Sequence, residues 1–263
     1  MTIDHMGPFL AFLGACILAV PLAGYHVWAQ SGHFRRLAPV LPAVILACIL
    51  VVGAALSIWH NQSGEHLGIL FGSETQDFGL SEYGVVLALL GAMGVSAILA
   101  FRVTGVERAI FAFVALGCFF VAGEELSWGQ WIFGWGTPEA LAAVNLQNET
   151  NAHNLIDPRL YDLAYAAIGF ATLLTAIVTY AAFGRDGSQA GGFPIRPLRL
   201  MGQWLRDSQT GLVWMLAGGV LLQHELFEEY SEFVFAVAVF LFLCRVLEAT
   251  PRTARSMKEQ AHV

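Results

Sequence analysis

Seven long apolar stretches, separated by polar connections, constrain this chain more than any other feature of its sequence. Several of them approach the roughly 20 residues that a helix needs to cross a hydrocarbon core about 30 Å thick. The pattern predicts an all-α, polytopic membrane protein in which residues 1–263 form a single domain of seven transmembrane helices. The predicted spans are approximately 8–29, 38–59, 83–101, 108–133, 160–183, 210–230 and 231–249.

The composition supports this interpretation and excludes some partners. The chain is 57% hydrophobic and only 13% charged, which leaves too few charges to cover a water-facing surface. A typical soluble chain is about 25% charged. The net charge of −7 argues against nucleic acid as a partner, since binding to phosphates requires a basic face. The four cysteines lie singly in apolar stretches, so neither disulfides nor a thiolate zinc site is expected.

The distribution of charge predicts the direction of the spans. With the N-terminus outside and the C-terminus inside, only Arg159 of the 13 basic residues falls on the outer side. Only five of the 20 acidic residues then fall on the inner side: Glu107, Asp186, Asp207, Glu248 and Glu259. An excess of Lys and Arg on the cytoplasmic side is the positive-inside rule. The expected location is therefore the inner (plasma) membrane, with polar loops at 60–82 and 134–159 facing the periplasm or exterior.

The fourth span is too short unless acidic residues enter the membrane. It has only 15 apolar residues, from Ala109 to Gly123, so its helix is predicted to continue through Glu124 and Glu125 to about Phe133. At 1.5 Å per residue, this places Glu124 within the outer leaflet.

The sixth span repeats the problem, because Gly211–Gln223 is only 13 residues long. Its helix is predicted to carry His224, Glu225 and Glu228 into the outer third of the bilayer. On such a helix His224 and Glu228 would be one turn apart, and four acids would share one face: Glu225, Glu228, Glu229 and Glu232. The alternative is a solvated turn between the sixth and seventh helices, with these acids in water.

A third group of polar residues lies in the outer connection between the fourth and fifth spans. Thr137-Pro138-Glu139 predicts the start of a short helix, with Thr137 as the N-cap and Pro138 in the first position. Glu149 and His153 follow, and they would share a face if that stretch is helical.

Carboxylates at this depth are costly, and they require bound metal, protons or a cationic ligand as compensation. Carboxylates with imidazole and no thiolate suit Zn²⁺, Fe or Mn, whereas carboxylates with Asn carbonyls alone suit Ca²⁺. We expect one residue from each of the three groups to converge in a shared site. The predicted metal ligands are Glu125, Glu149, His153, His224 and Glu228.

The expected chemistry is hydrolysis in the membrane, because metal-bound water is a nucleophile near neutral pH and a neighbouring Glu can act as its base. The segment His224–Glu228 resembles the zincin pattern HExxH with Glu in place of the second His, which makes Glu225 the expected general base. Glu124 is the second predicted catalytic residue. Substrates reaching the site laterally would be lipids, lipid-linked groups or membrane peptides.

Two other functions compete with a hydrolase. The chain could be a non-catalytic subunit or assembly partner of a larger membrane complex, which uses its acidic outer face for docking or for a structural cation. A cation or proton pathway ranks last, since the acids gather on one side instead of following the bilayer depth.

The residues Gly123–Gln130, with Thr137-Pro138-Glu139, Asn148-Glu149 and His153-Asn154, resemble a group of bacterial multi-pass membrane proteins of uncharacterised function. A fainter resemblance is to the CPBP (Abi/CAAX-type) intramembrane proteases, whose motifs are EExxxR, FxxxH and HxxxN/D. That resemblance implies Glu and His residues that activate water on membrane helices. The chain departs from these motifs by Gly129 in place of Arg, by Glu149 in place of Phe, and by Glu228 in place of Asn or Asp.

Overall fold

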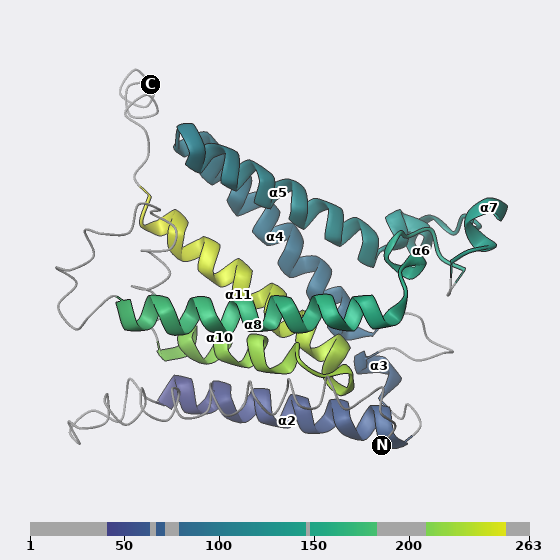
Figure 1. The fold of residues 1–263 in the computed structure, drawn as a ribbon, viewed down its shortest axis with the longest axis horizontal. Coiled ribbons are helices and arrows are strands. Elements are labelled where there is room, and N and C mark those ends of the chain that lie inside the picture. The colour runs from purple at the N-terminus through teal and green to yellow at the C-terminus, as the bar shows by residue number, and fades with distance from the viewer. Residues whose placement is uncertain (1–40, 64–66, 72–78, 146–147, 183–208, 251–263) are drawn as a thin grey trace. The chain divides into compact units, whose positions relative to one another are not determined.

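The computed structural model of the chain describes residues 41–63, 67–71, 79–145, 148–182 and 209–250. Every regular element in these ranges is a helix, and no strand occurs in them (Figure 1). The predicted fold class, all-α, is therefore confirmed for this part of the chain. The predicted span 8–29 lies outside the described residues.

Nine α-helices lie within the described ranges. They are α2 (Leu41–Ser63), α3 (Gly68–Phe71), α4 (Leu80–Arg102), α5 (Gly105–Glu125), α6 (Gln130–Phe133), α7 (Glu139–Ala142), α8 (Pro158–Ala182), α10 (Gln209–Leu221) and α11 (Glu228–Glu248). Short 3₁₀ turns occupy Ser127–Gly129, His153–Leu155 and Glu225–Phe227. Three helices are long and apolar enough to cross a membrane: Leu80–Arg102, Gly105–Glu125 and Glu229–Glu248.

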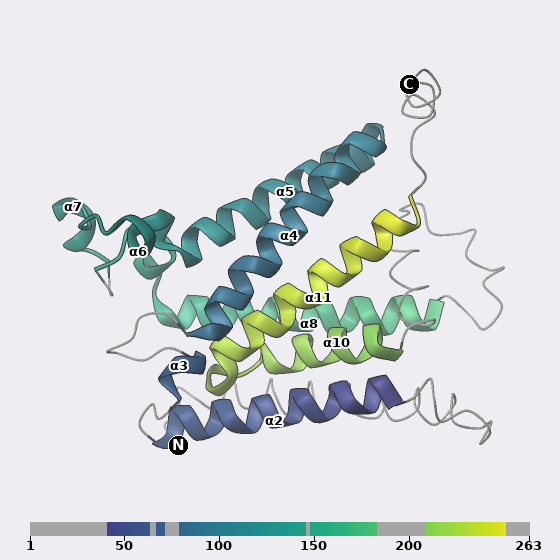
Figure 2. The same ribbon diagram turned by 180° about the vertical axis from the view of Figure 1, so that it is seen from behind.

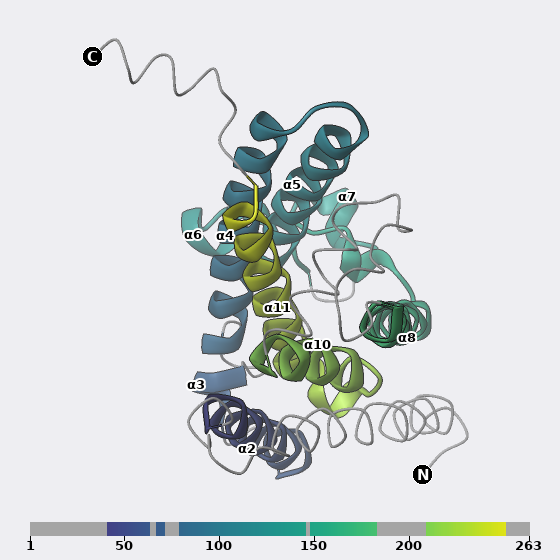
Figure 3. The same ribbon diagram turned by 90° about the vertical axis from the view of Figure 1, so that its left-hand side faces the viewer.

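The described residues form two compact units. The first unit contains those up to Gly84 and those of Asp157–Ala238, and the second contains Val85–Ile156 and those from Val239 onward. In the first unit α10 packs against both α2 and α8, as Figures 1 and 2 show from opposite sides and Figure 3 shows nearly end-on.

Two glycines let α8 and α10 pack closely. A Cβ on Gly169 would lie 2.8 Å from the Gly219 carbonyl oxygen, and a Cβ on Gly219 would lie 3.1 Å from the Gly169 carbonyl oxygen. Small residues at a helix contact allow this approach of two backbones. The Gln223 side chain fills the adjoining space and donates through Nε2 to the Gly219 oxygen at 3.0 Å and to the Ala166 oxygen at 3.2 Å.

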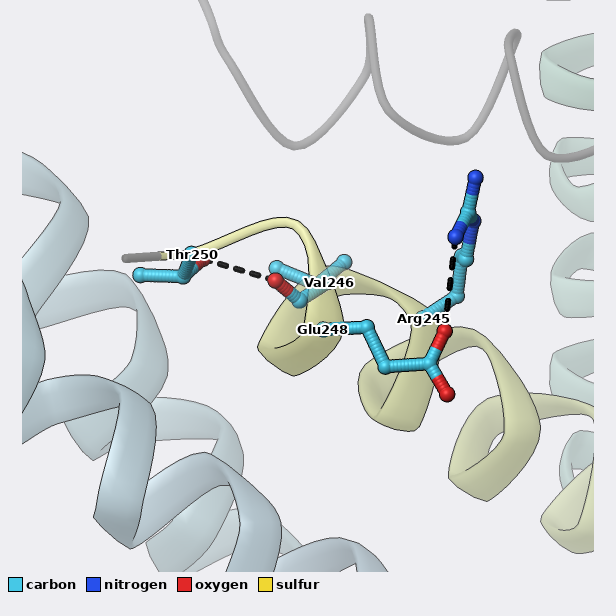
Figure 4. A network of polar contacts seen from close by, with 4 residues as sticks. All are labelled: Arg245, Val246, Glu248 and Thr250. Carbon is cyan, nitrogen blue, oxygen red and sulfur yellow. Dashed lines mark hydrogen bonds and ion pairs between the residues drawn. The ribbon is translucent and has the colours of Figure 1, made fainter. Parts of the chain in front are cut away.

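In the second unit, the ends of α4 and α11 are tied by polar contacts. Arg102 Nη1 donates to the Thr250 carbonyl oxygen at 3.4 Å. The Thr250 hydroxyl donates to the Val246 oxygen at 2.7 Å, and Arg245 pairs with Glu248 at 3.3 Å beside it (Figure 4). Both members of that ion pair are exposed, so it contributes little to stability.

Helix α5 corrects the prediction for the fourth span. It begins earlier than predicted, at Gly105, and ends at Glu125 instead of continuing to Phe133. The sequence interpretation counted only the apolar run, whereas Glu107 and Arg108 are accommodated in the first turn of the helix. Twenty-one residues already span about 32 Å, so no extension through the aromatic residues is required.

The prediction for the sixth span is also wrong at its outer end. Helix α10 stops at Leu221, and α11 begins at Glu228 after a turn and the 3₁₀ segment Glu225–Phe227. His224 and Glu228 therefore do not lie one turn apart on a single helix, and Glu225 does not share a helical face with the three later acids. The cause is local, because Nδ1 of His224 accepts the Leu226 N–H at 3.1 Å and competes with helical hydrogen bonding.

Candidate functional site

A polar cluster in the second unit begins in the last turn of α5. The Glu124 carboxylate is only 6% exposed and accepts two hydrogen bonds, from the Trp128 indole N–H at 2.6 Å and from the Ala152 backbone N–H at 2.7 Å. The Trp128 ring folds back over Gly123, where an added Cβ would lie 2.9 Å from the ring. The residue pair Gly123-Glu124 thus anchors the connection that follows the helix.

Glu149 is the centre of this cluster. Its Oε2 atom accepts hydrogen bonds from the Ser127 hydroxyl at 3.0 Å, from Asn151 Nδ2 at 2.5 Å and from Asn154 Nδ2 at 3.2 Å. Its backbone N–H donates to Asn145 Oδ1 at 3.0 Å. Ser127 and Asn151 are almost wholly buried, so two of the three side-chain donors to this carboxylate are shielded from water.

A second set of hydrogen bonds joins the two halves of the connection. Thr137 donates its hydroxyl to the Asn148 carbonyl oxygen at 2.5 Å and accepts from Gln130 Nε2 at 3.1 Å. Gln130 Oε1 accepts the Thr150 N–H at 2.7 Å. The predicted short helix is confirmed as α7, with Pro138 instead of Thr137 as its N-cap. Thr137 ties the connection together instead of capping the helix.

The backbone at Ser127–Gly129 is strained. The φ angles of Ser127, Trp128 and Gly129 are 45°, 55° and 95°, and that of Asn148 is 58°. A left-handed conformation costs a non-glycine residue roughly 1–2 kcal/mol. This turn ends α5 and directs the Ser127 hydroxyl and the Trp128 indole toward the two carboxylates.

Sequence reasoning missed these donors. Ser127, Trp128, Asn145 and Asn151 had no predicted role, although Ser127 and Trp128 belong to the Gly123–Gln130 motif that the sequence analysis singled out. The available signal was the density of amides after Val144, because buried amides are the neutral donors that satisfy a carboxylate.

The structure brings together two of the predicted site residues, Glu124 and Glu149. Their hydrogen-bond donors are neighbours in the chain, at Ser127 and Trp128 and again at Asn151 and Ala152. Glu125 is half-buried in the last turn of α5.

Glu149 and His153 do not share a helical face, because residues 148–152 are irregular and His153 only starts a 3₁₀ turn. The His153 side chain lies outside the described part of the structure. Its predicted role as a ligand stays a prediction.

The remaining predicted residues belong to the first unit. His224 accepts the Leu226 N–H, and the Leu226 carbonyl oxygen in turn accepts from Ser57 at 2.9 Å and Asn61 at 3.0 Å on α2. The side chains of Glu225 and Glu228 lie outside the described part. Convergence of these residues with the Glu124–Glu149 cluster stays a prediction.

Where side chains are described, no group of three or more His, Cys, Asp or Glu residues is placed to hold a metal ion. The cluster supplies two carboxylates, Glu124 and Glu149, so a metal there would need ligands from elsewhere in the chain. The predicted Zn²⁺, Fe, Mn or Ca²⁺ site stays a prediction.

We predict that Asn151→Asp destabilises the protein at neutral pH. The substitution replaces a donor to Glu149 with a second carboxylate, and losing a hydrogen bond to a charged group costs about 1.5–3 kcal/mol. Repulsion raises the pKa of the introduced carboxylate in the folded state above its unfolded value. The destabilisation should therefore be full at about pH 7 and shrink as the pH falls toward ~4.

The measurement is the melting temperature of the parent and variant in detergent as a function of pH. The matched control is Asn148→Asp, because the Asn148 side chain is exposed and Asp also tolerates its left-handed backbone. Equal effects of the two substitutions, or a loss that does not depend on pH, would contradict the proposed packing of Asn151 against Glu149.

Comparison with known proteins identifies no relative of this chain. No protein-family model matches the chain, and searches of curated proteins and of solved structures give no significant match. The resemblances of the Gly123–Asn154 motifs to bacterial multi-pass proteins and to CPBP proteases therefore stay predictions.

Proposed function

We propose that this chain is an inner-membrane protein with seven transmembrane helices, its N-terminus outside and its C-terminus inside. Three helices of spanning length and apolarity support this arrangement. Helices α2 and α8 add 23 and 25 residues, enough for about 35 Å or more at 1.5 Å per residue. The orientation rests on the excess of basic residues on the inner side.

At the outer face, we propose that the Glu124–Glu149 cluster belongs to a site for a divalent cation. The observation that carries this proposal is the asymmetry of Glu149. Its Oε2 accepts three hydrogen bonds, whereas its Oε1 accepts none from the described residues. Metal-binding carboxylates are commonly oriented in this way by hydrogen bonds from a surrounding shell.

Ligands beyond Glu149 would come from the predicted set of Glu125, His153, His224 and Glu228. These carboxylates and imidazoles favour Zn²⁺, Fe or Mn, and Ca²⁺ if only oxygen atoms contribute. Glu124 is held at both oxygens by Trp128 and Ala152, which suits a residue that positions the connection.

The reaction that such a site supports best is hydrolysis. A metal such as Zn²⁺ held there would supply an acidified water as nucleophile, and Glu225 would be the candidate base. The substrates would be lipids, lipid-linked groups or membrane peptides that enter the site from the outer leaflet.

A second function is favoured by the hydrogen bonds that both carboxylate oxygens of Glu124 accept. Because both of its oxygens accept internal hydrogen bonds, the cluster could serve only to hold residues 126–156 as a rigid outer surface. In that case the protein would be a non-catalytic subunit, and this surface would dock a partner in a larger membrane complex.

The proposed orientation predicts that Thr104 and Glu139 lie on opposite sides of the membrane. Both residues are exposed, one between α4 and α5 and the other in the first turn of α7. Thr104→Cys and Glu139→Cys, each in a chain whose native cysteines are replaced by alanine, are treated in intact cells with a membrane-impermeant maleimide. Labelling of Glu139→Cys alone is expected, and labelling of both or only of Thr104→Cys would refute the orientation.

The metal proposal predicts that His224→Asn lowers the metal content of the purified protein, while Glu225→Gln leaves it unchanged. Asn retains an acceptor for the Leu226 N–H, so the turn is preserved while the imidazole is lost. Elemental analysis of the parent, both variants and the control Glu139→Gln measures the difference. Metal affinity should also fall as the pH drops, because the ligands must lose their protons to bind.

A parent protein without stoichiometric metal would refute the cation site. If His224→Asn retains as much metal as the parent, His224 is not a ligand. Co-purification of a stoichiometric partner that Glu149→Gln releases, in the absence of metal, would support the subunit function instead.

A further inference from the structure

The connection between α5 and α8 has its polar side chains inside and its large apolar side chains outside. Ser127 and Asn151 are 0% and 2% exposed. By contrast, Ile132, Phe133 and Val144 are 63%, 73% and 64% exposed. This distribution is the reverse of that in a loop surrounded by water, where large apolar side chains turn inward.

The sequence of the connection agrees with its surface. Residues 126–156 contain no Lys or Arg, and their only acidic residues are Glu139 and Glu149. Glu149 is turned into the cluster, so Glu139 is the one carboxylate of this segment that is exposed. A water-facing segment would typically have about a quarter of its residues charged.

Internal hydrogen bonding compensates the polar groups. The side chains of Glu149, Asn151 and Gln130 and the backbone N–H of Thr150 bond within the connection, and the Ala152 N–H bonds to Glu124 at the end of α5. Among the described residues of the connection, the Thr150 hydroxyl is the one buried side-chain group without a partner. Such closure is optional in water, but it is required in hydrocarbon, where an unpaired backbone or side-chain group costs several kcal/mol.

The exposed apolar surface continues that of a span-length helix. On α5, Phe113, Phe119 and Phe120 are exposed, as expected for side chains that face lipid. The Trp128 ring packs edge-on against Phe119 and Phe120, with centroids 6.1 Å and 5.5 Å apart. The apolar surface of α5 therefore extends onto the turn that follows it.

Beyond that turn, Phe133 and Trp135 stack with centroids 5.3 Å apart and cover Gly129, where an added Cβ would lie 3.0 Å from Phe133 and 3.2 Å from Trp135. Both rings remain exposed on their outer side. Tryptophan at such a position is typical of the membrane–water interface, since its ring is apolar and its N–H is polar.

We propose that the described residues of the connection, 126–145 and 148–156, are embedded in the phospholipid of the outer leaflet, at the boundary between head groups and acyl chains. The segment is thus part of the membrane domain and not an aqueous loop. Glu139, at the start of α7, marks the part that faces water. The proposal rests on the proposed function in that α5 crosses a bilayer with its C-terminal end outside, and it holds for either candidate function of the site.

The test uses nitroxide spin labels on single cysteines, in a chain whose four native cysteines are replaced by alanine. The labelled positions are Phe133→Cys and Val144→Cys on the apolar surface, Glu139→Cys on the polar side and Phe113→Cys on α5. The protein is reconstituted in phosphatidylcholine vesicles, and collisions of each label with oxygen and with a water-soluble nickel chelate are measured. Circular dichroism and size exclusion confirm that each variant is folded.

Labels at Phe133 and Val144 are expected to collide more with oxygen than with nickel, as does the reference label at Phe113, and the label at Glu139 should show the reverse. Nickel accessibility at Phe133 and Val144 equal to that at Glu139 would overturn the proposal. Protection of both labels from oxygen and nickel together, with spin–spin broadening, would also overturn it, because a second copy would then cover the surface. A nickel-accessible label at Phe113 would instead refute the membrane-spanning arrangement itself.

Discussion

The hydrogen bonds that hold the Glu149 carboxylate determine how the chain continues beyond the span-length helix α5. A carboxylate at membrane depth is stable only if donors or cations replace its water. Ser127, Asn151 and Asn154 provide donors to one oxygen, and they come from both ends of the connection. The left-handed turn at Ser127–Gly129 is the conformational cost of bringing these donors together.

This arrangement links the local chemistry to the environment of the whole segment. Because many polar groups of this segment bond to one another or to Glu124, the outside of the segment can consist of Ile132, Phe133 and other large apolar side chains. The same closure leaves Oε1 of Glu149 without a described donor. The connection between α5 and α8 is thus compatible with lipid on its outside and with one bound cation at Glu149.

Much of the helical organisation could be predicted from the sequence, because the lengths of apolar runs depend on composition alone. The ends of the helices could not. Helix α5 stops at Glu125 because the Trp128 indole bonds back to Glu124, and α10 stops at Leu221 with His224 bonding forward to Leu226. Both stops depend on a side chain finding a specific backbone or carboxylate partner. Of the cluster, only the carboxylates could be identified from the sequence, because charges within an apolar chain are costly. Its Ser and Asn donors could not, because such residues are common in any polar loop.

The central claim is that hydrogen bonds within residues 124–154 close the connection, and hydrogen–deuterium exchange tests it most directly. In the structure, the backbone N–H groups of Glu149, Thr150 and Ala152 donate to side-chain acceptors, whereas residues 135–136 of the same segment make no such described bond. The measurement is made on the protein in lipid nanodiscs. Peptides covering residues 148–152 should exchange at least about tenfold more slowly than those covering 134–137, since exchange requires the bonded state to open. Equal, fast exchange of the two segments would show that the network does not form, and it would contradict the account.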